Sequence, residues 1–163
     1  MQPVVANDVY FMKKAVFFLF AVITGCCSKS FAFDVTVAKD GSGNYTTVQA
    51  AIDAAPTGRT TPYTIYIKNG KYREKISIPS SKPYLQLIGE SVANTVLTYN
   101  DYAGLNTSCN TTLGTQNSAS FSVNATDFAA VNITFENTYG DGSQAVTVLV
   151  NADRAVFKNC RFL

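Results

Sequence analysis

Short segments of alternating apolar and polar residues dominate the chain after residue 60. Gly, Asn, Asp, Ser or Pro separates most of them. Alternation with a period of two, bounded by turn residues, predicts β-strands. We expect strands over residues 64–68, 75–78, 85–88, 95–99, 119–123, 130–135, 145–150 and 155–162. Many short strands at close spacing are typical of a sandwich, a barrel or a parallel β-helix.

A weak internal sequence repeat, called the 22-residue echo below, favours the parallel β-helix among these three folds. Phe135-Glu136-Asn137 recurs as Phe157-Lys158-Asn159, an offset of 22 residues. An offset of this size fits one coil of a solenoid in which equivalent positions stack on one another. Residues 99–118 break the strand pattern with a polar, Asn- and Thr-rich segment, which we interpret as a protruding loop.

One segment has helical periodicity. Residues 45–55 place apolar side chains at positions 48, 51, 52 and 55, which share one face of a helix. Thr46 or Thr47 is suited to cap its start, and Pro56 marks its end. The sequence therefore predicts a single short helix ahead of the strands.

The first 32 residues have the pattern of a signal peptide region. Met12-Lys13-Lys14 is a basic start, and the ten apolar residues 15–24 that follow are too few to span a bilayer. We expect translation to start at Met12, with residues 1–11 as a spurious extension. Two processing routes stay open: cleavage after Ala32, or lipidation of Cys26 in a lipoprotein-like box. Either route exports residues 33–163, which form the folded domain.

Charge and cysteine content limit the partners of this domain. Residues 33–163 carry ten Lys and Arg and ten Asp and Glu, so the +2 net charge of the whole chain comes from the leader. This balance predicts no nucleic-acid binding and no electrostatic membrane attachment. Cys109 and Cys160 are the cysteines beyond the leader. Export permits a disulfide between them, and two independent thiols are the alternative.

The chain contains no histidine. Its residues therefore cannot supply a Ser-His-Asp or Cys-His nucleophilic site, and the commonest zinc ligand is missing. No Walker-type phosphate loop occurs. We expect no metal and no cofactor, and acid–base chemistry would fall to carboxylates, Tyr or Lys.

Several motifs, in order, resemble those of the pectin methylesterases (pectinesterases). The chain is similar to that family in these stretches: 40–48, 51–56, Gly70-Lys71-Tyr72-Arg73-Glu74, 87–90, 117–120, 132–138, Ser143-Gln144-Ala145-Val146 and 153–162. Each motif is weak by itself, whereas their order and spacing are specific. The resemblance covers residues 34–163.

This resemblance implies a mainly β fold: a right-handed parallel β-helix of the pectin-lyase-like kind with a short N-terminal capping helix. It implies a secreted enzyme without metal that hydrolyses the methyl esters of polygalacturonate, the pectin backbone. In the family one Asp attacks the ester, a second Asp acts as acid and then base, and Gln side chains stabilise the oxyanion. Gln144 matches the first of these Gln residues, and Thr115 matches a substrate-contacting Thr.

Two departures from the family pattern affect the expected activity. The family's Gln-Ala-Val-Ala-Leu-Arg signature appears here as residues 144–149, with Leu149 in place of the Arg. The segments Gln-Asp-Thr-Leu and Asp-Phe-Ile-Phe-Gly, which carry both catalytic Asp residues, are absent from the sequence. We therefore interpret residues 33–163 as the N-terminal part of such a domain, truncated at its C-terminal end and inactive alone. A non-catalytic pectin-binding β-helix, or another pectin-active β-helix enzyme such as a polygalacturonase or lyase, are the alternatives.

Overall fold

The computed structural model describes residues 33–107 and 111–163, which belong to one compact unit. The predicted signal peptide region and Cys109 lie outside these residues. The described elements are, in chain order, β1 Val35–Val37, α1 Val48–Ala54, β2 Tyr63–Ile67, β3 Gly70–Arg73, β4 Ile76–Ile78, β5 Leu85–Gly89, β6 Thr95–Tyr99, the 3-10 helix η1 Gln116–Ser118, β7 Phe121–Val123, β8 Ala129–Val131, β9 Thr134–Asn137, β10 Val148–Val150, β11 Val156–Lys158 and β12 Arg161–Phe162.

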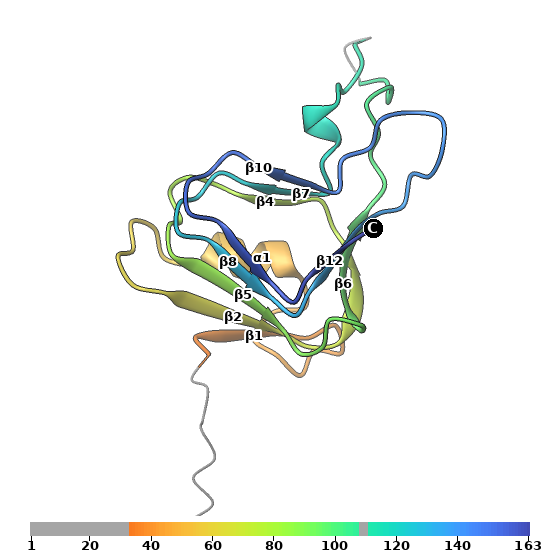
Figure 1. The fold of residues 1–163 in the computed structure, drawn as a ribbon. Helices are drawn as coiled ribbons and strands as arrows, with labels where there is room; N and C mark the ends of the chain where they lie inside the picture. The colour runs from red at the N-terminus through yellow and green to blue at the C-terminus, as the bar shows by residue number, and fades with distance from the viewer. Residues whose placement is uncertain (1–32, 108–110) are drawn as a thin grey trace, which may run out of the picture. The chain divides into compact units, whose positions relative to one another are not determined.

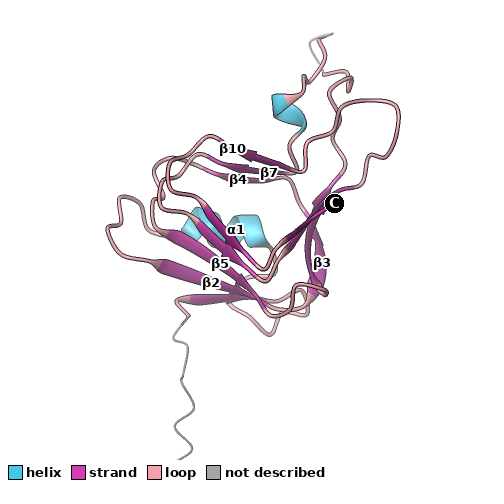
Figure 2. Ribbon diagram, viewed as in Figure 1, coloured by secondary structure: helices cyan, strands magenta, loops and turns pink. Residues whose placement is uncertain are grey.

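The strands form three parallel sheets. Their orders are β1-β2-β5-β8-β11, β10-β7-β4 and β12-β9-β6-β3, and every strand pair within them is parallel. From β2 onward, consecutive strands belong to different sheets, so the chain winds round a central axis and each turn stacks on the one before (Figure 1). Crossovers between parallel strands are right-handed in nearly all proteins. The fold is the expected right-handed parallel β-helix, with strands on its walls and loops at its corners (Figure 2).

The coil length differs from the sequence prediction. Phe135 pairs with Phe162, and Phe157 pairs with Ala130, so the two motifs of the 22-residue echo occupy different sheets. The true offset in this region is 27 residues, as in the Asn132–Asn159 pair. The two motifs are therefore not equivalent positions of successive coils, although an offset of 22 residues does separate β2 from β5, where Tyr63 pairs with Leu85. Phe135 and Phe157 resemble each other only in facing the same interior, where their rings meet edge to face at 5.8 Å.

Two expected strands are each divided in two. Asn132 and Asn159 adopt left-handed backbone conformations, with φ of 58° and 52°. This conformation turns the chain from one sheet into the next, and Asn tolerates it better than most residues. The Nδ2 group of Asn159 donates to Oδ1 of Asn132 at 2.7 Å, so the two corners stack as a ladder. Sequence patterning missed these corners, and it also missed β1 and β3.

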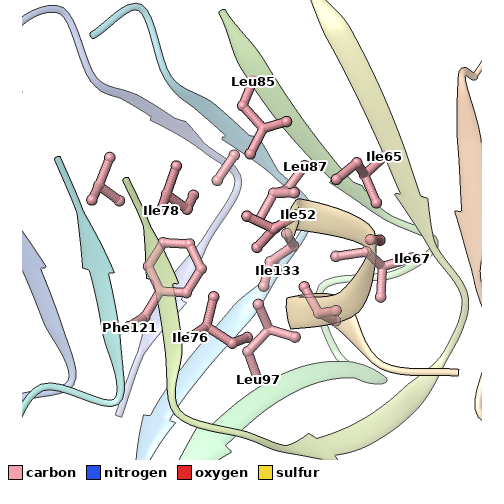
Figure 3. Packing of buried hydrophobic residues seen from close by; sticks show 14 of the residues in the cluster. Ile52, Ile65, Ile67, Ile76, Ile78, Leu85, Leu87, Leu97, Phe121 and Ile133 are labelled. Carbon is pink, nitrogen blue, oxygen red and sulfur yellow. The ribbon is translucent and has the colours of Figure 1, made fainter. Parts of the chain in front are cut away.

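The interior of the coils is an apolar core. Its inward side chains come from all three sheets and from α1, and the residues in Figure 3 are nearly inaccessible to solvent. Burying one such Ile, Leu or Phe stabilises a fold by about 1.5–3 kcal/mol. The helix covers the end of the β-helix formed by the first coil, because it packs against β1, β2 and β4. This is the expected capping position.

Side chains distant in sequence fix both ends of α1. At its start, the Glu74 carboxylate accepts from Val48 N at 3.0 Å and from Gln49 N at 2.9 Å, beside the expected cap Thr47. At its end, the buried Lys82 ammonium donates to the carbonyls of Asp53 and Ala55. Glu74 thus belongs to a Gly-x-Tyr-x-Glu motif whose role is structural, as its buried Tyr72 also shows.

Two further expectations concern thiols and membranes. Within the described residues Cys160 is a free, half-buried cysteine, and burial raises the pKa of its thiol. Its disulfide with Cys109 stays a prediction. Among the described residues, no helix is long and apolar enough to cross a bilayer.

Candidate functional site

Two long loops leave the β-helix at the same corner. The first joins β6 to β7 and contains η1, and the second joins β9 to β10; both project together from the coils (Figure 1). Ala103 N donates to the carbonyl of Gln144 at 2.8 Å, linking the loops through their backbones. The rings of Tyr102 and Tyr139 stack with centroids 4.0 Å apart. The loops therefore form one surface rather than two independent flaps.

This surface brings together the two site residues predicted from the sequence. Thr115 immediately precedes η1, and Gln144 lies shortly before β10. The Thr115 hydroxyl donates to Oε1 of Gln144 at 2.6 Å, although the residues are 29 positions apart. Both side chains are exposed, so a ligand can reach them.

The hydrogen bond also orients the Gln144 amide. An amide has an acceptor end and a donor end, and Thr115 occupies the acceptor. Within the described part of the chain, Nε2 has no protein acceptor. Its two N–H groups are thus free to donate to an oxygen atom brought by a ligand.

A polar side chain behind the site holds both loops in place. Asn137, at the end of β9, donates from Nδ2 to the carbonyls of Asp101 and Val146 at 3.0 Å each, and to that of Ser118 at 3.4 Å. Its Oδ1 accepts from Tyr139 N at 3.0 Å. One amide thus connects the β9–β10 loop with two points of the β6–β7 loop.

The buried hydroxyl of Ser118 adds a second connection. It donates to the carbonyl of Thr115 at 2.6 Å and accepts from Val146 N at 3.2 Å. Nearby, the Lys75 ammonium bonds Oδ2 of Asp101 at 2.5 Å and the carbonyl of Asn117 at 2.6 Å. These hydrogen bonds therefore fix the loop backbone that carries Thr115 and Gln144. The sequence singled out Thr115 and Gln144 as candidates, and it gave no signal for Ser118, Asn137 and Lys75, which support them.

Carboxylates near the site have structural partners or lie exposed. Asp101 is paired with Lys75, and Glu136 forms an ion pair with Lys71 with Nζ and Oε2 2.7 Å apart. Lys71 holds the pKa of Glu136 below its usual value, against the opposing effect of burial. Asp141 is exposed in a glycine-flanked turn. Over residues 33–107 and 111–163, no cluster of His, Cys, Asp or Glu is suited to hold a metal ion.

The fold is a parallel β-helix, and an exposed pair of amide and hydroxyl side chains, Gln144 and Thr115, lies on its two projecting loops. Residues 34–163 match the family model described as Pectinesterase. A pectinesterase of Petunia integrifolia is 44% identical over 131 residues, covering 78% of this chain. The chain belongs to the pectinesterase family.

Solved structures agree with this assignment. Pectin methylesterase from carrot superposes with a TM-score of 0.74 at 36% identity, covering 82% of this chain and 40% of that one. Pectin methylesterase PemA from Erwinia chrysanthemi gives a TM-score of 0.73 at 31% identity, covering 79% and 42%. The chain spans 33% of the Petunia protein's length, well under half of each of these relatives.

Proposed function

We propose that this chain supplies one side of the active site of an enzyme that hydrolyses methyl esters of polygalacturonate, releasing methanol. In this site Gln144 donates a hydrogen bond from Nε2 to the oxyanion of the tetrahedral intermediate. Thr115 contacts the substrate and holds the Gln144 amide. The observation that carries the proposal is the 2.6 Å hydrogen bond that leaves Nε2 of Gln144 exposed and unpaired within the described residues.

A neutral amide is well suited to this role. It donates without a change of protonation state, so the donor is available at any pH at which the protein is folded. The amide stabilises the oxyanion most when it is already oriented before the negative charge develops, because reorienting the donor costs free energy. The hydrogen bonds from Asn137 and Ser118 to the two loops supply that rigidity.

Pectin is the proposed partner. A pectin methylesterase solved in complex with a hexasaccharide superposes on this chain with a TM-score of 0.72 at 32% identity. Because the chain's own residues provide a donor and a hydroxyl at an exposed surface, we expect it to bind methylated pectin fragments. Affinity electrophoresis in gels containing methylated pectin, with xylan gels as the control, tests this. Retardation that is equal in both gels would contradict it.

Ester hydrolysis by this route also needs a nucleophile, and we assign that role to none of the described residues. The carboxylates near Thr115 and Gln144 are either ion-paired or in an exposed turn. We therefore infer that residues 1–163 alone release no methanol from pectin above background. A longer product of the same locus containing Gln-Asp-Thr-Leu and Asp-Phe-Ile-Phe-Gly segments should release it.

In that longer product, Gln144→Ala should lower kcat by about two to three orders of magnitude, as for other oxyanion donors, with a smaller effect on KM. Methanol release by the 163-residue chain would show that the chemistry lies on other residues.

A second candidate function is pectin binding without catalysis. Within the described residues, Nε2 of Gln144 is a free donor, and the carboxylates of Asp101 and Glu136 are held in ion pairs. Both observations favour binding without catalysis for the chain acting alone. Gel retardation by methylated pectin, with no methanol release from any product of the locus, would select it.

We also infer export, through cleavage after Ala32 or lipidation of Cys26, to the extracellular space or cell envelope. Mass spectrometry of the exported protein should find Phe33 or a lipidated Cys26 at the N-terminus. An exported species that begins at Met1 would contradict this.

A further inference from the structure

The loop before α1 covers the outer edge of strand β1. This strand lies at the end of its five-stranded sheet, paired with β2 on one side. On the other side, the backbone N–H of Asn44 donates to the carbonyl of Thr36 at 2.7 Å, and Oδ1 of Asn44 accepts from Thr36 N at 2.8 Å. The loop approaches so closely that a Cβ on Gly43 would meet the Thr36 carbonyl oxygen at 2.6 Å. Asn44 is therefore fixed against the strand edge.

These hydrogen bonds leave one end of the Asn44 side chain free. Asn44 is exposed, and within the described residues its Nδ2 has no hydrogen-bond partner. Asn44-Tyr45-Thr46 is an Asn-x-Thr sequence, the acceptor of N-linked glycosylation in exported proteins. The Thr46 side chain is also exposed, and its hydroxyl is unpaired in the same part of the chain. The folded protein thus presents the acceptor nitrogen and the hydroxyl of this sequence together.

Four further Asn-x-Ser/Thr sequences occur, at Asn106, Asn110, Asn124 and Asn132. The first two include residues of the segment 108–110, outside the described part of the chain. Asn124 and Asn132 are half-buried in coil corners, where each accepts a hydrogen bond from the Asn of the next coil. The Thr134 hydroxyl of the Asn132 sequence is buried and donates to the carbonyl of Val92 at 2.5 Å. Both corners offer a glycan less room than the exposed Asn44.

We propose that Asn44 is an N-glycosylation site when the chain is exported through the endoplasmic reticulum. In the transfer, Nδ2 forms a bond with C1 of the first N-acetylglucosamine of a lipid-linked oligosaccharide. The bond from C1 to the lipid pyrophosphate breaks, and Nδ2 loses one proton. Oδ1 remains a carbonyl oxygen, so its hydrogen bond with Thr36 N is kept.

The position of Asn44 gives the glycan a physical role. A sheet edge is where a strand of another chain can pair, and a bulky, polar glycan beside β1 adds cover to that edge. Strand β1 and the two projecting loops lie on opposite sides of the coils (Figure 1). The glycan therefore leaves Thr115 and Gln144 accessible. The proposal rests on the export inferred above, through cleavage after Ala32, and not on esterase activity.

The test expresses the full chain with its own leader in a yeast secretion host. Mass spectrometry maps peptides of the secreted protein before and after treatment with peptide N-glycosidase. We expect a glycan on the peptide that contains Asn44. Thr46→Ala, which keeps Asn44 and its contacts with Thr36, should lose this glycan, and Thr46→Ser should keep it.

Two more variants guard against effects of misfolding. Asn44→Asp removes the acceptor nitrogen but retains an oxygen that accepts from Thr36 N, so it should fold and carry no glycan there. Thr126→Ala removes the Asn124 sequence in the way that Thr46→Ala removes that of Asn44, and it should keep the Asn44 glycan.

The outcomes separate this inference from the export on which it rests. A secreted chain with unmodified Asn44, or a glycan that Thr46→Ala leaves in place, would overturn the glycosylation site while export stands. A chain that never enters the secretory pathway would overturn both. Methanol release is not part of any of these outcomes, so they leave the proposed esterase function to its own tests.

Discussion

The Thr115 hydroxyl holds the amide oxygen of Gln144 at 2.6 Å, across two loops that the sequence separates by 29 positions. This contact decides which end of the Gln144 amide faces a ligand. We predict that Thr115→Val, which keeps the shape and removes the hydroxyl, shifts the side-chain NH₂ signals of Gln144 in spectra of ¹⁵N-Gln-labelled protein. Thr115→Ser keeps the hydroxyl and should preserve them. Signals that Thr115→Val leaves in place would show that Thr115 does not orient the amide.

Asn137 should control the order of both loops. Asn137→Asp is isosteric but removes the N–H groups that reach Asp101, Ser118 and Val146, and it directs a carboxylate at their carbonyl oxygens. We expect faster amide hydrogen exchange in residues 113–119 and 140–147 together, and a loss of about 1–3 kcal/mol in the free energy of unfolding.

Asn132→Asp is the matched control for this variant. Asn132 uses its Oδ1 to accept from Asn159, and an Asp retains that acceptor. Exchange in the two loop segments should therefore stay as in the parent protein. If Asn137→Asp leaves both segments as protected as Asn132→Asp does, the side chain of Asn137 does not hold the loops.

Glu74 should stabilise the capping helix from 25 and 26 residues away. Glu74→Ala leaves the N–H groups of Val48 and Gln49 without the carboxylate, and we expect it to lower the free energy of unfolding by about 1–2 kcal/mol, as loss of other N-terminal caps does. Glu74→Gln keeps one acceptor oxygen and should lose less. Urea denaturation followed by circular dichroism measures both. Equal stability of all three proteins would mean that Thr47 alone caps the helix.

The sequence predicted the secondary structure where local pattern decides it. The alternation in residues 64–68 and 85–88 reproduced β2 and β5 almost residue for residue, since their inward side chains are buried in the apolar core. It failed at corners, because Asn132 and Asn159 turn the chain by backbone conformation, and a single polar residue there resembles an outward-facing position of a strand. Patterning therefore joined β8 to β9 and β11 to β12.

The candidate site was predictable only in part for a related reason. Gln144 and Thr115 carry a motif signal, whereas the roles of Asn137 and Ser118 depend on which backbone carbonyls lie near them in space. No local pattern encodes that proximity. The 27-residue coil was missed because the repeated features at this spacing are single residues, such as the Asn132–Asn159 and Asn124–Asn151 pairs, rather than a shared motif.

Acid should destabilise the protein through two ion-paired carboxylates. Lys71 holds the pKa of Glu136 below its usual value, and Arg154 does the same for Asp127. Their ionised forms favour the folded state, so this stabilisation is complete above the unfolded pKa values of about 4. It is lost as pH falls through and below them. Between pH 6 and pH 3, Lys71→Met and Arg154→Met should each flatten the decline of Tm. A decline as steep as that of the parent protein would contradict this.

The end of the β-helix opposite α1 should drive self-association. Strands β10, β11 and β12 are the edges of the three sheets at that end, and Val150, Val156, Phe162 and Leu163 expose between 39% and 57% of their surface there. Uncovered strand edges with apolar side chains are sites of association between chains. At the other end, α1 packs against β1, β2 and β4. Because one end is covered and one is open within the described residues, we expect end-to-end dimers before larger aggregates.

Sedimentation velocity should show a concentration-dependent shift from 17.6 kDa monomer to dimer. Val156→Lys, at the most exposed of these positions, should weaken dimerisation through charge repulsion, whereas Thr60→Lys adds the same charge on a distant loop and should not. A protein that stays monomeric at high concentration, or that dimerises equally as Val156→Lys, would show that this edge does not mediate association.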